Sequence, residues 1–369
     1  MIRLSKSVVG NAEADAVAHI IKDIGYLGMG QTVGELEHAL ENYIGGGRRC
    51  ICVNSGTAAL HLAIQAVTRP GDEVLVPSFT FVASYQAITG AGCVPVSCDI
   101  DPVTLTLDLN DAERRLTPRT KAMMPVYYAS NSQMARQYQA FAREHGLRLV
   151  EDAAHAFGCS LDGEKIGSFG DVVCFSFDGI KNITTGEGGA IFTADDDVIQ
   201  QVSDARLLGV QKDSEKRYAG TRSWQFDVID QGYRYHMSNI FAAIGLVQLS
   251  RFESEFAPRR RAIAQRYTEL LKDVPHVRLT PMNYAQDIVP HIFALQILDG
   301  KRPLLEQRLK EADIQYGIQY APNHKLSFFK ADYELPVTDE VYSRIISLPM
   351  HPELTEEQIQ QICNIIQSL

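Results

Sequence analysis

The chain has 369 residues, of which 45% are hydrophobic and 22% charged, and its formal net charge at pH 7 is -10. This length exceeds the usual limit of one hydrophobic core, so we expect one large and one smaller domain. The acidic balance argues against nucleic acid or an anionic membrane as the main partner, although local basic groups can still bind an anionic small molecule. Because no apolar run approaches a membrane helix and the first residues lack the apolar core of a signal peptide, we expect a cytoplasmic protein.

The first half of the chain alternates between helical and strand-like patterns. Apolar residues at helical spacing predict helices over residues 11–24 and 33–44. Short apolar runs then alternate with helical patterns, and they predict strands over residues 49–53, 73–76, 93–97, 121–126 and 147–150. This alternation is typical of a mostly parallel sheet covered by helices on both faces. Ligands of such sheets bind at the carboxyl ends of the strands, where Ser55–Thr57, Ser78–Phe81 and Asp152–His155 fall.

Two further apolar runs, Val172–Phe177 and Gly189–Phe192, flank a polar, glycine-rich stretch that carries Lys181. The pattern predicts a hairpin of two buried strands. Burial disfavours the ammonium form of a lysine and lowers its pKa, and a neutral amine can form a Schiff base with a carbonyl compound. A solvated surface lysine is the alternative, and the hairpin alone does not decide between the two.

From about residue 251 the pattern changes. We expect a helix to residue 272, a strand over 288–297, a helix over 302–312, a strand over 314–320 and a final helix over 356–366. The sequence therefore predicts a large domain over residues 12–250 and a smaller α+β domain over 251–369, with residues 1–11 packed on the smaller one. His291, Tyr320, His324 and His351 stand on or beside loops of this part that could face the ligand site, but we expect structural roles for these histidines.

Several side chains at the predicted strand ends have the chemistry of a cofactor site. The stretch from Ser55 to Thr57 precedes a helix, where backbone N–H groups and the helix dipole favour an anion; a plain helix cap is the alternative. Asp152 could hold a protonated ring nitrogen or merely cap a helix. Phe81 could stack on a flat ring or belong to the core. Together with the amine of Lys181, these groups are the parts that binding of pyridoxal 5'-phosphate (PLP) requires.

Five motifs then occur in a fixed order, namely SGTAAL (55–60), GDEVLVPSFTF (71–81), VEDAAHAFG (150–158), FSFDGIKNITTGEGGA (175–190) and GYRYHMSN (232–239). Together they resemble the nucleotide-sugar aminotransferases of the DegT type. The resemblance implies the α/β fold of PLP fold type I, which is aspartate-aminotransferase-like. It also implies a homodimer with its active sites at the subunit interface.

The resemblance gives a role to each matching position. Lys181 would form the Schiff base with the cofactor and move the proton between two carbons. Asp152 would pair with the pyridine nitrogen, and His155 would lie near the phenolic oxygen. Phe81 would stack on the ring. The groups that would hold the phosphate are Gly56, Thr57 and Ser176, joined by Arg234 or Asn239 in place of an asparagine that relatives contribute from the other subunit.

The resemblance also implies a reaction, the transfer of an amino group from L-glutamate to a keto group of a nucleotide-linked deoxysugar. The TGEGG sequence at 185–189 is more similar to enzymes that act at C4 than to those that act at C3. Asp178-Gly179-Ile180, where relatives often have proline and threonine before the lysine, favours dTDP-4-keto-6-deoxyglucose. We expect the product to enter a surface polysaccharide, such as the O-antigen of lipopolysaccharide, or a secondary metabolite.

Three alternatives stay open at this point. The chain could act at C3 of the sugar, it could be a non-catalytic PLP-binding regulator on the same fold, or it could be a PLP enzyme acting on a free amino acid. The presence of Lys181 argues against a regulator, because binding alone needs no reactive amine. Relatives that dehydrate sugars carry histidine at that position. Tyr127-Tyr128-Ala129-Ser130 stands where many relatives have a histidine and a glycine, so this segment bears on the sugar.

Overall fold

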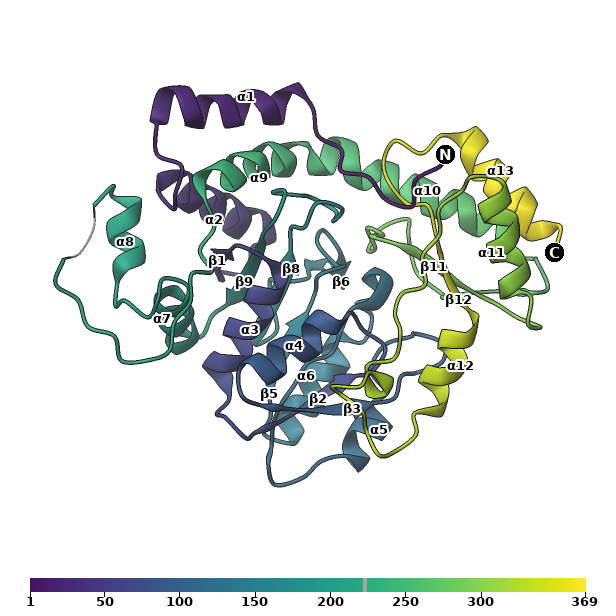
Figure 1. Cartoon of the computed structure of the whole chain (residues 1–369), viewed down its shortest axis with the longest axis horizontal. Helices are drawn as coiled ribbons and strands as arrows, with labels where there is room; N and C mark the ends of the chain where they lie inside the picture. The colour runs from purple at the N-terminus through teal and green to yellow at the C-terminus, as the bar shows by residue number, and fades with distance from the viewer. Residues whose placement is uncertain (222–223) are drawn as a thin grey trace.

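The computed structural model describes residues 1–221 and 224–369. Its centre is a sheet of seven strands, flanked by helices (Figure 1). In spatial order the strands are β1 (Arg49–Val53), β9 (Gly189–Thr193), β8 (Val172–Ser176), β5 (Arg148–Asp152), β4 (Thr120–Met123), β2 (Glu73–Pro77) and β3 (Val94–Cys98). The pairs from β8 to β3 are parallel, whereas β9 is antiparallel to both of its neighbours. The predicted mostly parallel, mixed sheet is confirmed.

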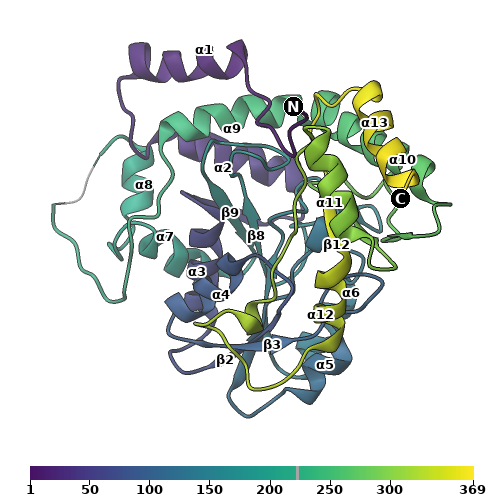
Figure 2. The same ribbon diagram turned by 45° about the vertical axis from the view of Figure 1, so that its right-hand side comes forward.

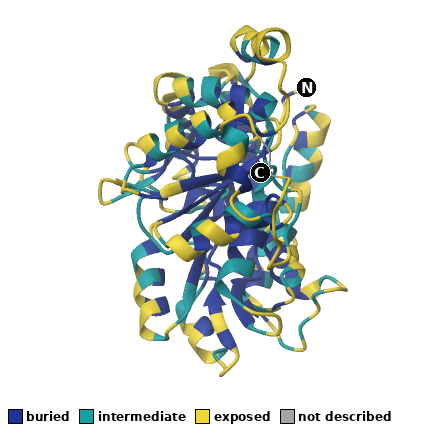
Figure 3. Cartoon of the chain, turned by 90° about the vertical axis from the view of Figure 1, so that its left-hand side faces the viewer, coloured by how far each residue is buried: buried dark blue, intermediate teal, exposed yellow. Residues whose placement is uncertain are grey.

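Successive residues of a strand enter two different hydrophobic cores, because side chains alternate between the faces of a sheet. On β1, Ile51 and Val53 pack with the core of α3 (Gly56–Val67), α4 (Val82–Gly90) and α7 (Asp196–Ala205). Cys50 and Cys52 belong to the core on the other face. That face is covered by α2 (Gln31–Ile44), α5 (Leu109–Arg114), α6 (Ala135–Glu144) and α9 (Asn239–Arg251). Figure 3 shows the buried strands between helices whose outer sides are exposed.

A smaller antiparallel sheet lies in the C-terminal part of the chain. It consists of β10 (Val277–Leu279), β11 (Phe293–Ile297) and β12 (Ile345–Leu348). The helices of this part are α10 (Ala257–Leu271), α11 (Arg302–Glu311), α12 (Pro336–Arg344) and α13 (Glu356–Gln367). Figures 1 and 2 show α10, α11 and α13 beside both termini of the chain.

The N-terminal residues lie against this C-terminal part. Ile2 donates its N–H to the carbonyl of Asp313 at 2.9 Å, and Met350 donates to the carbonyl of Leu4 at 2.9 Å. The long helical stretch from α9 continues through a π-helical turn, Phe252–Phe256, into α10. The division into domains 12–250 and 251–369 stays a prediction.

The remaining elements are α1 (Asn11–His19) with a π-helical turn Ile20–Ile24, α8 (Asp213–Tyr218) and the short ribbon of β6 (Ser160–Leu161) and β7 (Glu164–Lys165). Within residues 1–221 and 224–369, every helix falls short of the length and apolar character of a membrane span.

Two strand predictions were wrong. The strand expected over 288–297 begins only at Phe293, since Pro290 has no N–H to donate to a ladder. Residues 314–320 form no strand and make only isolated pairings, between Ile314 and Ile2 and between Gly317 and Ser347. The strand β12 was missed.

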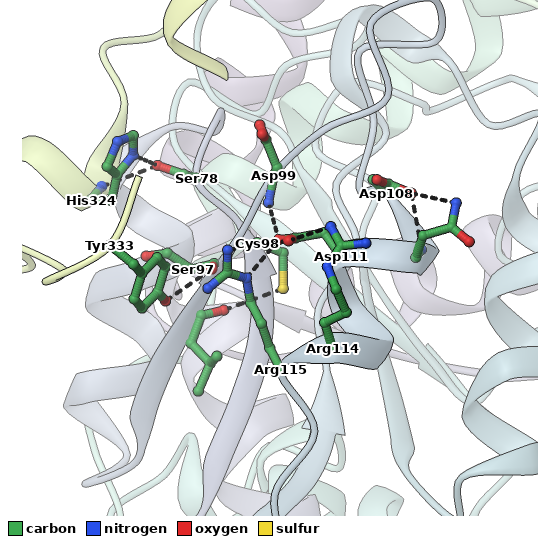
Figure 4. Close-up of polar contacts among 12 residues, drawn as sticks. Ser78, Ser97, Cys98, Asp99, Asp108, Asp111, Arg114, Arg115, His324 and Tyr333 are labelled. Carbon is green, nitrogen blue, oxygen red and sulfur yellow. Dashed lines mark hydrogen bonds and ion pairs between the residues drawn. The ribbon is translucent and has the colours of Figure 1, made fainter. Parts of the chain in front are cut away.

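The segment that follows residue 320 returns to the large sheet and fastens at the ends of β2 and β3. Nδ1 of His324 lies 2.7 Å from Oγ of Ser78, and the Tyr333 hydroxyl donates to the carbonyl of Ser97 at 3.0 Å (Figure 4). These contacts bring Tyr320 to the carboxyl edge of the large sheet, the edge where its parallel strands end.

Candidate active site

Lys181 lies in the loop between β8 and β9, which pair in register from Val172–Thr193 to Ser176–Gly189 as the predicted hairpin. Its Nζ lies 3.3 Å from Nε2 of His291. Burial lowers the pKa of the amine to about 8, and the carboxylates of Asp152 and Asp178 oppose that shift. A substantial fraction of the amine is therefore neutral near physiological pH, which nucleophilic attack on a carbonyl requires. This environment favours a Schiff-base lysine over a solvated surface lysine.

Asp152 is the last residue of β5 and is 5% exposed. Its Oδ2 accepts a hydrogen bond from Oγ of Ser84 at 2.8 Å, and its Oδ1 accepts from the N–H of Ala154 at 3.1 Å. Burial raises the pKa of this carboxyl, whereas the two hydrogen bonds and the charge of Lys181 lower it. A buried carboxylate of this kind is stabilised by a cationic N–H, because the charge pair offsets its lost hydration.

His155 follows three residues later and is also buried. Its Nε2 lies 3.1 Å from the hydroxyl of Tyr320, and its ring lies 4.5 Å from the ring of His291, centroid to centroid. Burial and the charge of Lys181 hold its pKa well below the usual value, so the imidazole is neutral. Its Nδ1 is buried and has no hydrogen-bond partner among the described residues. A neutral ring with one unused nitrogen can bond a ligand oxygen.

Phe81 caps the N-terminus of α4, and it is 55% exposed. Its ring lies 5.5 Å from that of Tyr320. Exposure of a large aromatic ring at the carboxyl edge rules out the core position that the sequence left open. The ring is free to lie against a flat ligand, and aromatic rings favour such stacking.

Gly56 is the first residue of α3, and its neighbour Ser55 caps that helix by accepting a hydrogen bond from the N–H of Ala58 at 3.1 Å. A Cβ on Gly56 would lie 2.7 Å from Cβ of Ser176. Only glycine therefore allows the start of α3 to approach the end of β8 so closely. The approach places the hydroxyl of Ser176 beside the first turn of a helix, whose free N–H groups and dipole favour a phosphate. Thr57 in the same turn is exposed.

Arg234 and Asn239 come from the segment that leads into α9. The exposed Arg234 belongs to a segment beside β1, and its carbonyl accepts from Nδ2 of Asn54 at 3.2 Å. Asn239 is buried at the start of α9; its Oδ1 accepts from the N–H of Gly30 at 3.0 Å and its Nδ2 donates to the carbonyl of Tyr26 at 2.9 Å. Both ends of that amide are thus engaged within its own subunit.

The residues present fit PLP. The reactive amine of Lys181 and the buried carboxylate of Asp152 interact electrostatically, and His155 has an unused ring nitrogen beside them. The glycine-dependent contact of α3 with Ser176 supplies an anion site at the same edge of the sheet. These groups would hold an aldehyde carbon, a ring N–H, a phenolic oxygen and a phosphate.

Two residues that were not predicted to belong to the site contact it, His291 and Tyr320. His291 contacts Lys181, and Tyr320 contacts both His155 and Phe81. No local sequence pattern predicts that either residue contacts Lys181 or His155, because each reaches the site by long-range docking of the C-terminal part. Pro290, directly before His291, was the one available signal: a proline within an apolar run indicates that the strand is interrupted at that point.

Comparison with known proteins agrees with the fit of these residues to PLP. Residues 8–367 match the DegT/DnrJ/EryC1/StrS aminotransferase family. The chain is 34% identical, over 369 residues that cover 99% of it and 95% of the relative, to the dTDP-4-dehydro-2,3,6-trideoxy-D-glucose 4-aminotransferase of Saccharopolyspora spinosa. It is similar to the crystal structure of the sugar aminotransferase CalS13 from Micromonospora echinospora, with a TM-score of 0.90, 31% identity and full coverage of both chains. It is also similar to the PLP-form of the putative sugar aminotransferase Spr1654 from Streptococcus pneumoniae, with a TM-score of 0.89, 27% identity and coverage of 99% and 97%.

Proposed function

Because the chain belongs to the DegT/DnrJ/EryC1/StrS aminotransferase family, and is thus a PLP-dependent sugar aminotransferase, we propose that it moves the amino group of L-glutamate to C4 of a nucleotide-linked 4-keto-6-deoxyhexose. The observation that carries this proposal is the electrostatic interaction of a lysine of lowered pKa with a buried carboxylate at the carboxyl edge of the sheet. PLP, when bound there, supplies an electrophilic carbon and an electron-withdrawing ring.

The chain's own residues perform the remaining tasks. Lys181 would bond the cofactor and would move the proton between the two carbons; an amine with a pKa near 8 is suited to both directions. Asp152 would keep the ring nitrogen protonated. Neutral His155 would hold the phenolic oxygen, Phe81 would stack on the ring, and Gly56, Thr57 and Ser176 would bind the phosphate.

The sugar and the position are inferred from two features. The relative from S. spinosa acts at C4 according to its name, and the TGEGG sequence at 185–189 favours the same carbon. The stretch Asp178-Gly179-Ile180 lies directly before the lysine, and Oγ of Ser7 donates to the carbonyl of Gly179. We propose dTDP-4-keto-6-deoxyglucose as the substrate, for a cytoplasmic pathway to a surface polysaccharide, such as the O-antigen of lipopolysaccharide, or a secondary metabolite.

We also propose a homodimer with shared active sites. Large apolar side chains are exposed on two segments, Ile21–Leu27 and the stretch from Trp224 to Ile229. Surfaces of this kind favour burial against another protein surface. Of the two candidates for the phosphate contact across the interface, Arg234 is preferred, because its side chain is exposed while the amide of Asn239 is already bonded at both ends.

The proposal is tested in two half-reactions. The PLP-loaded protein is mixed with L-glutamate, and conversion of the cofactor absorbance to that of the pyridoxamine form is followed. The converted protein is then offered dTDP-linked 4-keto-6-deoxyglucose and its 3-keto isomer, and the product is identified by NMR. We expect conversion by glutamate and an amine at C4. Absence of conversion would refute the enzyme, and an amine at C3 would refute the position.

A further inference from the structure

His291 has no place in the roles given so far, yet it lies next to the reactive lysine. It is 3% exposed, and its Nε2 lies 3.3 Å from Nζ of Lys181. Burial, together with the charges of Lys181 and Arg260, holds its pKa well below the usual value. A neutral imidazole whose proton is on Nδ1 can accept a hydrogen bond at Nε2, and an amine can donate one.

The backbone around His291 is tied to the backbone of Lys181. Arg260 is 2% exposed, and its guanidinium donates to the carbonyls of Pro290 at 3.2 Å, His291 at 3.3 Å and Lys181 at 3.4 Å. Nδ2 of Asn182, the residue after the lysine, donates to the carbonyl of Val289 at 3.0 Å. The distance between the lysine and the histidine is therefore set by buried hydrogen bonds on both sides of the pair.

A second tie fixes His291 relative to His155. The buried hydroxyl of Ser130 donates to the carbonyl of His155 and accepts a hydrogen bond from the N–H of His291 at 2.9 Å. Ser130 itself has a φ of 72°, in the left-handed region that non-glycine residues seldom adopt. The two imidazoles consequently stand side by side, one next to the amine and the other next to Tyr320.

We propose that His291 is a positioning residue, which holds the amine of Lys181 by a hydrogen bond from Nζ to Nε2 whenever that amine is not bonded to the cofactor. The inference rests on the role of Lys181 under the proposed function. A lysine that alternates between bonding a carbon and moving a proton needs a defined resting place for its released amine, since its four-carbon stem is flexible. His291 supplies that place without competing for protons, because its ring stays neutral.

The first test reads the amine itself and needs no turnover. The full-length apo-protein is treated with acetic anhydride across pH 6 to 11, and acetylation of Lys181 is measured by mass spectrometry of its peptide. The wild-type midpoint is expected near pH 8. In His291→Phe the ammonium form loses its acceptor, so the midpoint should fall by about half a unit or more. His291→Gln restores an acceptor and should return the midpoint toward wild type.

The second test measures the rate of the glutamate half-reaction in single turnover. We expect a loss of about tenfold in His291→Phe, with partial recovery in His291→Gln. His276→Phe is the control, because His276 is another buried histidine and bonds the carbonyl of Ile366 away from the site. Unchanged midpoint and rate in a folded His291→Phe protein would overturn the inference. Turnover by Lys181→Ala would instead refute the proposed function, while the acetylation of wild-type Lys181 would still report on His291.

Discussion

The Lys181 hairpin and the segment Ile288–Ile292 meet at the same amine, but their backbones are held in different ways. The hairpin strands pair through five registered residue pairs of a regular antiparallel ladder. The segment has no ladder; the N–H of Ile288 donates to the carbonyl of Asn283, and the other bonded backbone groups up to His291 have side-chain partners. Arg261 Nε donates to the carbonyl of Ile288, and Asn182 Nδ2 donates to that of Val289. The N–H of Val289 donates to Cys159 Sγ, and the N–H of His291 donates to Ser130 Oγ. Arg260 donates to the carbonyls of Pro290 and His291.

The difference explains why one region could be predicted and the other could not. Both are apolar runs, because both are buried. In the hairpin the buried backbone is satisfied locally by its own partner strand, so an apolar run bounded by turn residues is enough to predict it. In the segment Ile288–Ile292 most hydrogen bonds of the buried backbone come from side chains that are distant in the sequence, because Pro290 has no N–H to donate to a strand ladder. An apolar run signals burial; it does not reveal how the backbone groups are satisfied.

The largest effect is expected from the hairpin. Lys181→Ala removes the group that bonds the cofactor and moves the proton, so turnover should fall by at least about 10⁴-fold. The fold should persist, since burying this amine lowers its pKa and so costs stability instead of adding it. Steady-state assay and urea unfolding of the apo-protein check both statements.

Lys121→Ala is the matched control for that variant. Lys121 is exposed on β4 and donates to the carbonyl of Pro118, and its removal should leave turnover near wild type. Retained turnover in Lys181→Ala would show that the hairpin is structural only.

The next effect concerns Asp152, which borders the hairpin through β5. Asp152→Asn keeps the shape but cannot hold a ring proton by charge, so the protein should take up PLP while the glutamate half-reaction slows by about 100-fold or more. Glu151→Gln on the same strand is the control. Burial raises the pKa of Glu151 to about 8, so the native residue is largely uncharged at pH 7 and the amide should change the rate little. Equal rates in the two variants would contradict the role of Asp152.

The segment is tested through Arg260. Arg260→Met removes three hydrogen bonds and leaves buried carbonyls unpaired, so the free energy of unfolding should drop by about 2–4 kcal/mol in urea titrations. Arg344→Met is the control, because Arg344 pairs with Glu340 one turn away on an exposed helix face and should matter by less than about 0.5 kcal/mol. A loss in Arg260→Met no larger than that would mean that the segment is held by packing alone.

The other residues of the site also divide into those with local sequence patterns and those placed by long-range contacts. Gly56, Asp152, His155, Ser176 and Lys181 lie at or just after the ends of strands whose apolar patterns are local, and the rule that parallel strands end at one edge of a sheet is enough to predict that these residues lie together. Phe81 was ambiguous, because an aromatic residue after a strand is equally compatible with a core; only its exposure decides.

What the sequence could not reveal depends on long-range docking. Tyr320 lies in a stretch predicted as a strand, and it reaches His155 because His324 and Tyr333 fasten the following residues to Ser78 and Ser97. The choice between Arg234 and Asn239 likewise depends on distant partners, since the amide of Asn239 bonds Gly30 and Tyr26. Neither the contacts of Tyr320 nor those of Asn239 produce a periodic pattern in the sequence.

The smallest expected effect is a change in the pKa of Lys181 when the segment Ile288–Ile292 is altered. An exposed lysine has a pKa near 10.5, and burial beneath the segment lowers that of Lys181 to about 8. Only the neutral amine bonds an aldehyde, so the rate of PLP uptake by the apo-protein should rise with pH and level off above about pH 8. Arg260→Met loosens the segment and so lets water reach the amine, which favours the ammonium form; the midpoint should move upward by about half a unit to one unit. Stopped-flow absorbance across pH 6 to 10 measures the shift, and an unmoved midpoint in a folded variant would show that the segment does not control the hairpin's chemistry.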